Sequence, residues 1–112
     1  MKISKPWGDE LIWANTSDYI GKILFIEAGK RLSLQHHVQK KESLYVQSGA
    51  ITITLENQDG VLTKHILKPK QWLHIPAGSK HRIAAQKDSE IFEVSTPHLD
   101  DVIRHEDDYG RI

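Results

Sequence analysis

The sequence predicts an all-β protein whose short strands form a barrel or a sandwich. Apolar residues mostly alternate with polar ones or form short runs, as strands require, and few windows have helical spacing. Glycine and proline separate these segments, which is typical of tight turns between antiparallel strands. With 112 residues, the chain suits a single domain, residues 1–112.

Eight strands are expected, each a short apolar or alternating segment bounded by turn residues. Residues 20–28 are apolar on both faces of the expected strand, which indicates burial on both sides, whereas residues 61–67 alternate. Ser48-Gly49 is a two-residue hairpin signal, and residues 57–60 and 76–78 are further turns. The expected strands are residues 10–14, 20–28, 43–47, 51–56, 61–67, 71–75, 81–85 and 91–95.

The barrel is expected to occupy about residues 8–96. An irregular acidic tail, residues 97–112, follows it, and at most one short helical turn is expected there, around residues 100–104.

The composition excludes several classes of function. The chain has no cysteine, so it has no disulfide, no thiolate metal site and no cysteine nucleophile. Its formal net charge is zero, so no strong field attracts nucleic acid or an anionic membrane. The N-terminus lacks an apolar stretch and no segment is long and apolar enough to span a membrane, so a cytoplasmic protein is expected. The seven histidines stand out, because histidine is the commonest metal ligand.

Four residues are candidate ligands for one divalent metal ion: Gln35, His37, Glu42 and His81. Gln35 and His37 share one face if they lie on a strand. Glu42 follows a polar turn, so a return strand could bring its side chain beside His37. His81 begins another expected strand and could lie near the same residues. Two imidazoles, a carboxylate and an amide oxygen suit Zn, Fe, Mn, Ni or Co and leave open positions for water or substrate. Spacing alone leaves an ordinary, metal-free role for these histidines equally open.

The same residues resemble the cupin family. Residues 29–49 have the spacing of the first cupin motif, G-x5-H-x-H-x3–4-E-x6-G, with Gln35 at the first His position. Residues 70–85 have the spacing of the second motif, G-x5-P-x-G-x2-H-x3-N, with Lys70 and Ala85 at its Gly and Asn positions. The resemblance implies a cupin jelly-roll β-barrel, a double-stranded β-helix, and supports the metal site.

Gln35 indicates the subfamily, because the metal strand of mannose-6-phosphate isomerases resembles residues 32–37 and has a Gln at this place. Four further segments resemble those enzymes: residues 5–8, Lys22 on an early strand, residues 72–82, and residues 93–94 with 103–111. The resemblance thus covers nearly the whole chain. It implies a sugar or sugar-phosphate substrate and favours zinc among the possible metals.

That resemblance implies aldose–ketose isomerisation through an enediol, in which a metal ion stabilises the oxyanion and a base carries the proton. Lys22 and Glu93 are the candidate bases, and Arg104 is a further candidate catalytic residue, although it could instead pair with acidic tail residues. Arg31, Lys40 and Lys80, with Arg104, are candidate cations for binding the phosphate.

Departures from the isomerase pattern leave other functions open. The family has an Arg where this chain has Lys40, and a His-Trp pair where it has Ser43-Leu44. If those positions line the sugar pocket, the protein could be a non-catalytic metal- and carbohydrate-binding cupin. An iron-dependent cupin oxygenase and a structural protein without metal are the remaining alternatives.

A homodimer is also expected, because pairing of an exposed N-terminal sheet edge with a second copy would cover that edge. Trp7, Trp13 and Trp72 are expected to be core residues or anchors of the dimer interface rather than platforms for stacking a sugar.

Overall fold

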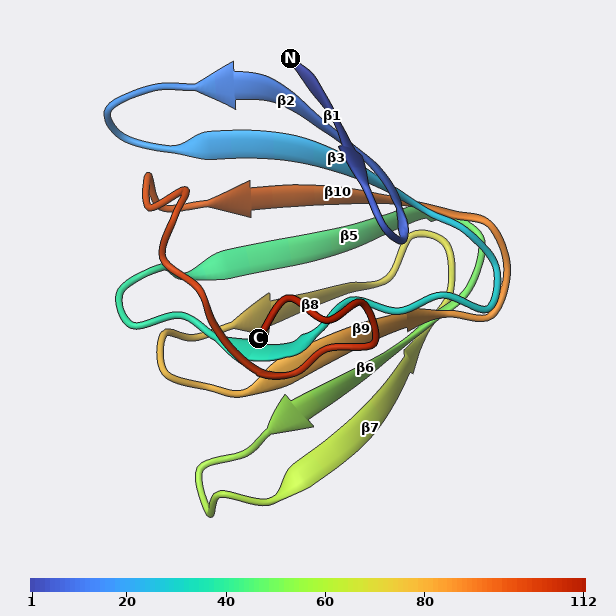
Figure 1. The fold of residues 1–112 in the computed structure, drawn as a ribbon, viewed down its shortest axis with the longest axis vertical. Coiled ribbons are helices and arrows are strands. Elements are labelled where there is room, and N and C mark those ends of the chain that lie inside the picture. The colour runs from blue at the N-terminus through green and yellow to red at the C-terminus, as the bar shows by residue number, and fades with distance from the viewer.

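The computed structural model of residues 1–112 consists of eleven β-strands without any helix (Figure 1). The strands are β1 (Lys2–Lys5), β2 (Gly8–Asn15), β3 (Ile20–Ile26), β4 (Leu34–His36), β5 (Glu42–Ser48), β6 (Ile51–Glu56), β7 (Leu62–Leu67), β8 (Trp72–Ile75), β9 (His81–Ala85), β10 (Ser89–Ser95) and β11 (Ile103–Glu106). No helical segment that could cross a bilayer is therefore found.

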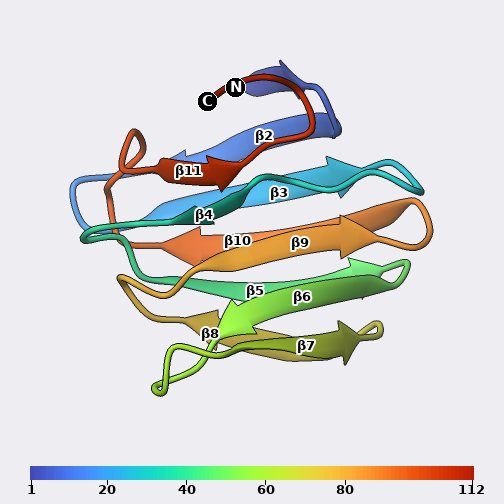
Figure 2. The ribbon, with the colours of Figure 1, turned by 60° about the horizontal axis from the view of Figure 1, so that its bottom comes forward.

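The strands form two antiparallel sheets that face each other (Figure 2). The six-stranded sheet has the order β1-β2-β3-β10-β5-β8, and the five-stranded sheet has the order β11-β4-β9-β6-β7. The chain passes repeatedly from one sheet to the other, so β10 lies between β3 and β5, and β4 lies between β11 and β9. This arrangement confirms the predicted all-β jelly roll.

The apolar core lies between the two sheets and comes from every second residue of the central strands. Leu24, Ile91 and Val46 form one inward row across β3, β10 and β5. Ile53 and Ile83 face them from β6 and β9 of the other sheet, and all five side chains are at most 3% exposed. Burial of each such side chain contributes about 1.5–3 kcal/mol to stability.

The inward positions change from aliphatic to ionisable along the same strands. Two residues from Leu24, β3 carries Lys22, and two residues from Ile91, β10 carries Glu93. On β5 the inward residue before Leu44 is Glu42, and on β9 the one before Ile83 is His81; all of these ionisable residues are buried. The alternation of strand side chains therefore places a polar site directly beside the apolar core.

The eight predicted strands are present to within a few residues, and three further strands, β1, β4 and β11, were not in the expected set. β1 and β11 are short polar edge strands that exist through pairing with β2 and β4. The helical turn expected around residues 100–104 is wrong, because residues 103–106 form β11. The β11–β4 pairing joins segments far apart in the chain, so local sequence carries no signal for it.

The hairpin predicted at Ser48-Gly49 is also wrong, because β5 and β6 lie in different sheets. The turn instead carries the chain from one sheet to the other, and Gly49 has a φ of 91°. A Cβ at this position would lie 2.6 Å from the carbonyl oxygen of Asp88 and 2.7 Å from the Cα of Ser89. Glycine is thus required both by the backbone conformation and by the close approach of the β9–β10 connection.

We expect Gly49→Ala to lower the free energy of unfolding by about 1–3 kcal/mol or more, because strain and steric contact add. Gly60→Ala is the matched control: Gly60 has a φ of 76° but nothing within 4 Å of an added Cβ. Urea denaturation of the two variants measures the difference. Equal losses would show that contact with Asp88 and Ser89 contributes nothing.

Candidate metal centre

His37, Glu42 and His81 bring two imidazoles and a carboxylate together inside the barrel. Their potential ligand atoms all lie within 4.8 Å of one another, and all three residues are buried. Nε2 of His37 is 3.5 Å from Oε2 of Glu42, and Nε2 of His81 is 3.3 Å from Oε1. His37 directly follows β4, while Glu42 and His81 begin β5 and β9.

The second nitrogen of each imidazole is held by a backbone carbonyl. Nδ1 of His37 donates to the carbonyl oxygen of Asp101 at 2.5 Å, and Nδ1 of His81 donates to that of Ser79 at 2.9 Å. A carbonyl oxygen can only accept, so each Nδ1 carries a hydrogen, and Nε2 is the nitrogen left to bind a metal ion when the ring is neutral. Both Nε2 atoms lie beside the Glu42 carboxylate.

These inward atoms fit a divalent metal ion. Nε2 of His37 and Nε2 of His81 are buried and have no hydrogen-bond partner, while Oε2 of Glu42, also buried, has the Lys40 ammonium at 2.9 Å. Buried polar atoms are rarely left unpaired, and two lone pairs beside a carboxylate oxygen repel one another unless a cation lies between them. A mixed nitrogen and oxygen donor set of this kind accepts zinc and several other transition metals.

Gln35, the predicted fourth ligand, lies on the inward face of β4, where it pairs with His81 of β9. Its side-chain oxygen accepts a hydrogen bond from the Ser33 hydroxyl at 2.6 Å. The residue lines the same cavity as His37. Ligation by Gln35 remains a prediction.

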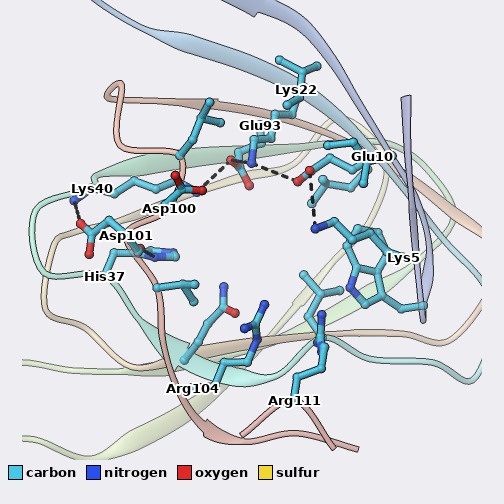
Figure 3. A pocket seen from close by; sticks show the side chains of 18 of the residues that line it. Lys5, Glu10, Lys22, His37, Lys40, Glu93, Asp100, Asp101, Arg104 and Arg111 are labelled. Carbon is cyan, nitrogen blue, oxygen red and sulfur yellow. Dashed lines mark hydrogen bonds and ion pairs between the residues drawn. The ribbon is translucent and has the colours of Figure 1, made fainter. Parts of the chain in front are cut away.

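Lysine and glutamate side chains alternate along one wall of the cavity and lead to the metal centre (Figure 3). We call this series the charge chain, and its members in order are Lys5, Glu10, Lys22, Glu93, Lys40 and Glu42. The closest approaches are 3.0 Å between Lys22 and Glu10 and 2.9 Å between Lys40 and Glu42. Lys40 also lies 3.2 Å from Glu93, so it joins the metal-centre carboxylate to the candidate base.

The charge chain shifts the pKa values of its members in different directions. Burial alone would lower the pKa of Lys40, but the carboxylates of Glu93 and Glu42 outweigh it and raise that pKa. Burial would raise the pKa of Glu42, but His37, His81 and Lys40 hold it well below its ordinary value. Burial, reinforced by the charge of Glu42, raises the pKa of Glu93, although Lys40 and Lys22 oppose the shift.

The cavity beside the metal centre has a volume of about 310 Å³, within the range of small-molecule sites. Arg104 and Arg111, from the C-terminal tail, point into it from the side opposite Lys22 and Glu93 (Figure 3). The Arg104 Nε is buried and has no hydrogen-bond partner, whereas Arg111 pairs with Asp107 at 2.9 Å. The tail residues 97–112 therefore form one wall of the pocket.

Asp101 connects this tail to the candidate metal centre. No sequence pattern indicated this role. Its carboxylate accepts hydrogen bonds from the backbone N–H groups of Val38, Gln39 and Lys40, at 2.7–2.9 Å. These three bonds hold the pKa of Asp101 at about 2. Its own carbonyl orients His37, so one residue positions both an imidazole ligand and the turn that leads to Glu42.

The structure brings Lys22, Glu93, Lys40 and Arg104 to the cavity but leaves Arg31 and Lys80 outside it. Arg31 instead makes a bidentate ion pair with Asp108, at 2.7 and 2.9 Å. Lys80 directly precedes the inward His81, so its side chain points to the opposite face. Their predicted role in substrate binding therefore has no support in the structure.

Two departures from the isomerase pattern lie away from the cavity. Leu44 is fully buried in the apolar core, and the Ser43 hydroxyl lies 2.7 Å from Nδ1 of His74, near the outer surface. Of the departures noted in the sequence near Glu42, only Lys40 lines the cavity. Ser43 and Leu44 thus do not alter the residues that face a ligand.

Three further charged residues line the cavity and were not among the candidates from the sequence: Lys5, Glu10 and Arg111. Glu10 could have been found, because alternation within residues 10–14 places it on the same face as the buried Ile12. Arg111, like Asp101, lies in the tail, and nothing in the local sequence relates it to residues 35–42.

Comparison with known proteins gives one family. The family model described as "Mannose-6-phosphate isomerase C-terminal" matches residues 1–107. The alginate biosynthesis protein AlgA of Pseudomonas aeruginosa is 32% identical over 98% of this chain. A putative mannose-1-phosphate guanylyltransferase of Vibrio cholerae is 32% identical over 92% of the chain. The chain spans only 23% and 22% of the length of these two relatives.

Solved structures show the same fold at lower sequence identity. KdgF from Halomonas sp. has a TM-score of 0.75 at 23% identity, covering 84% of this chain and 83% of that one. An RmlC-like cupin from Shewanella frigidimarina has a TM-score of 0.69 at 12% identity, covering 82% and 78%. These likenesses confirm the cupin fold.

We expect Asp101→Ala to weaken cobalt(II) binding about 10–100-fold, because the turn before Glu42 and the His37 ring lose their support. Asp100→Ala is the control, since it removes the same charge from a neighbouring carboxylate that accepts no hydrogen bond. Equilibrium titration followed by visible absorption measures both affinities. Unchanged binding in Asp101→Ala would show that the metal ligands are positioned without it.

Proposed function

Because this chain belongs to the mannose-6-phosphate isomerase C-terminal family, we propose that it is a metal-dependent sugar or sugar-phosphate isomerase. The observation that carries the proposal is the position of the buried Glu93 in a polar cavity, one lysine away from the three ligands His37, Glu42 and His81. A proton-transfer carboxylate and a Lewis-acid site are the two components that aldose–ketose isomerisation needs.

A divalent ion held by His37, Glu42 and His81 would polarise the carbonyl oxygen of the substrate. Zinc is the ion that the family resemblance favours, although iron, manganese, nickel and cobalt bind similar donors. Gln35, on the same inward face, is the proposed fourth ligand.

Glu93 is the proposed base. In the reaction a proton leaves the carbon next to the carbonyl and returns to the former carbonyl carbon, and a hydroxyl proton moves between the two oxygens. No other reactant is consumed. Glu93 is 6% exposed, and its Oε2 accepts no well-oriented hydrogen bond. A shielded carboxylate of this kind can hold the transferred proton between the two steps.

Lys22 and Arg104 have supporting roles in this proposal. Lys22 is 4.0 Å from Glu93 and stabilises its charged form when the proton is returned. Arg104 offers an unpaired guanidinium across the cavity, which suits the phosphate of a sugar phosphate. Lys40 is already paired with two carboxylates, so it positions Glu42 and Glu93 instead of binding substrate.

The second candidate is a metal-dependent binding module without turnover. It is favoured by the ion pairs of Glu93 with Lys22 and Lys40, because the two lysines oppose proton uptake by that carboxylate.

We expect the purified protein to contain about one divalent metal ion per chain and His37→Ala to lose it. His36→Ala is the matched control, because the neighbouring ring points outward and stacks on His105. Mass spectrometry of metals in protein made without added metal measures the content. Equal metal content in the two variants would place the ion elsewhere, and iron-dependent oxygen uptake would indicate an oxygenase.

We expect the metal-loaded protein to interconvert mannose 6-phosphate and fructose 6-phosphate, with kcat about 10²–10⁴-fold lower in Glu93→Gln. Glu90→Gln, on the outward face of the same strand, should keep full activity. Proton transfer is followed by deuterium incorporation from D2O into the sugar. Saturable sugar binding without deuterium incorporation would favour the binding module, and the absence of both would contradict the proposed substrate class.

A further inference from the structure

Two histidine side chains on the outside of the barrel join the C-terminal tail to the strand that leads to the metal centre. The rings of His36 on β4 and His105 on β11 stack at a centroid distance of 4.9 Å, with 22° between their planes. Nδ1 of His36 lies 2.7 Å from Nε2 of His105. The two strands are neighbours at one edge of the five-stranded sheet (Figure 2), so the pair connects residues 69 positions apart.

This histidine pair faces away from the cavity because strand side chains alternate. Gln35 and Arg104 are paired in register between the same two strands, and both line the cavity. Each histidine is next in sequence to one of these residues, so it lies on the opposite face of the sheet. A bulge between Arg104 and Glu106 leaves His105 without a paired residue on β4, and the ring of this extra residue reaches His36.

The two facing nitrogen atoms form a bidentate site for a metal ion. At 2.7 Å they can share only one hydrogen, which one ring donates and the other accepts. A metal ion can take the place of that hydrogen, because the donating ring can carry its hydrogen on its other nitrogen instead. The pair is open to solvent, so water molecules can complete the coordination.

The separation of the two nitrogens favours an ion with right-angled coordination. Ligand atoms about 2.0–2.1 Å from an ion lie about 2.8–3.0 Å apart at an angle of 90°, but about 3.3–3.4 Å apart in a tetrahedral arrangement. The observed 2.7 Å is nearer the first range. Square-planar copper(II) or octahedral nickel(II) therefore fits this pair better than tetrahedral zinc.

The charges beside the pair do not exclude a cation. The two charged side chains that act on His105 are of opposite sign, Glu56 and Lys80. They also lie close to each other, since the Glu56 carboxylate accepts a hydrogen bond from the backbone N–H of Lys80 at 3.2 Å. Their effects on a bound ion oppose each other.

We propose that His36 and His105 form a second metal site, separate from the barrel centre, which binds copper(II) or nickel(II) and holds the tail on β4. An ion bound by both rings binds only the docked tail, so it shifts the docking equilibrium toward that state. The docked tail carries Arg104 and Asp101, so an ion at this site also stabilises one wall of the cavity. The proposal does not rest on isomerase activity.

The second site is expected to bind more weakly than the barrel centre, because it supplies two protein ligands and not three. It should therefore fill only when metal is added, whereas the barrel centre keeps its ion through purification. This difference lets the two sites be measured separately in the full chain.

Calorimetric titration of the zinc-loaded protein with nickel(II) at pH 7.5 tests the site. One nickel ion per chain should bind without release of zinc, and His36→Ala and His105→Ala should each weaken binding by about 10–100-fold or more. His98→Ala is the matched control, because His98 is a tail histidine outside the pair. His81→Ala, which removes a ligand of the barrel centre, should still bind nickel at the second site.

Hydrogen–deuterium exchange of residues 97–112, followed by mass spectrometry, measures docking of the tail. Nickel should slow this exchange in the wild type and in His98→Ala, but not in His105→Ala. Circular dichroism verifies that each variant is folded.

Three results would overturn the proposal. Equal nickel binding in the wild type and His105→Ala would place the ion elsewhere. Release of one zinc ion for each nickel ion bound would show exchange at the barrel centre only. Nickel binding that leaves exchange of the tail unchanged would show that the ion does not hold the tail on β4.

Discussion

Three carboxylates and two ammonium groups are buried inside this small barrel, with the partly exposed Lys5 beside them, and they can share that interior only because they neutralise one another. An unpaired ion in a protein interior costs several kcal/mol. The charge chain avoids most of this cost by placing opposite charges at 2.9–4.0 Å along its whole length. Lys40 is its central member, since it contacts both Glu42 and Glu93. The position of the Glu42 carboxylate thus depends on Lys40.

The C-terminal tail, residues 97–112, contributes side chains to the wall of the cavity. Arg31 and Arg82 hold the tail through Asp108, and Tyr109 donates a hydrogen bond to the carbonyl of Arg31. This attachment brings Arg104 to the cavity and Asp101 to His37. Assembly of the candidate metal centre is therefore coupled to docking of the tail, because the His37 ring is oriented by a residue 64 positions away.

Of the departures from the isomerase pattern near Glu42, which are Lys40, Ser43 and Leu44, only Lys40 faces the cavity. Ser43 faces the outer surface and Leu44 faces the core. Having these two residues in place of a His-Trp pair therefore changes packing and not the lining of the cavity. Lys40 is the departure that faces the cavity, and it changes how Glu42 and Glu93 are held. Compared with arginine, lysine supplies a compact point charge that cannot form a planar bidentate pair. Under the proposed isomerase function, this difference is expected to affect proton transfer more than sugar binding.

The sequence by itself determined the fold class and eight of the strands, because strand alternation is a local property. Motif spacing also identified His37, Glu42 and His81 as residues that could share one site. The sequence also indicated Lys22 and Glu93 as pocket residues through the family resemblance. Only the tertiary structure decided which sheet each strand joins, as the failure of the Ser48-Gly49 hairpin shows. Pairing of β11 with β4, the support given by Asp101 and the exclusion of Arg31 from the cavity were likewise decided there. The physical reason is that these features depend on contacts between segments separated by tens of residues, and local patterns of polarity contain no record of such contacts.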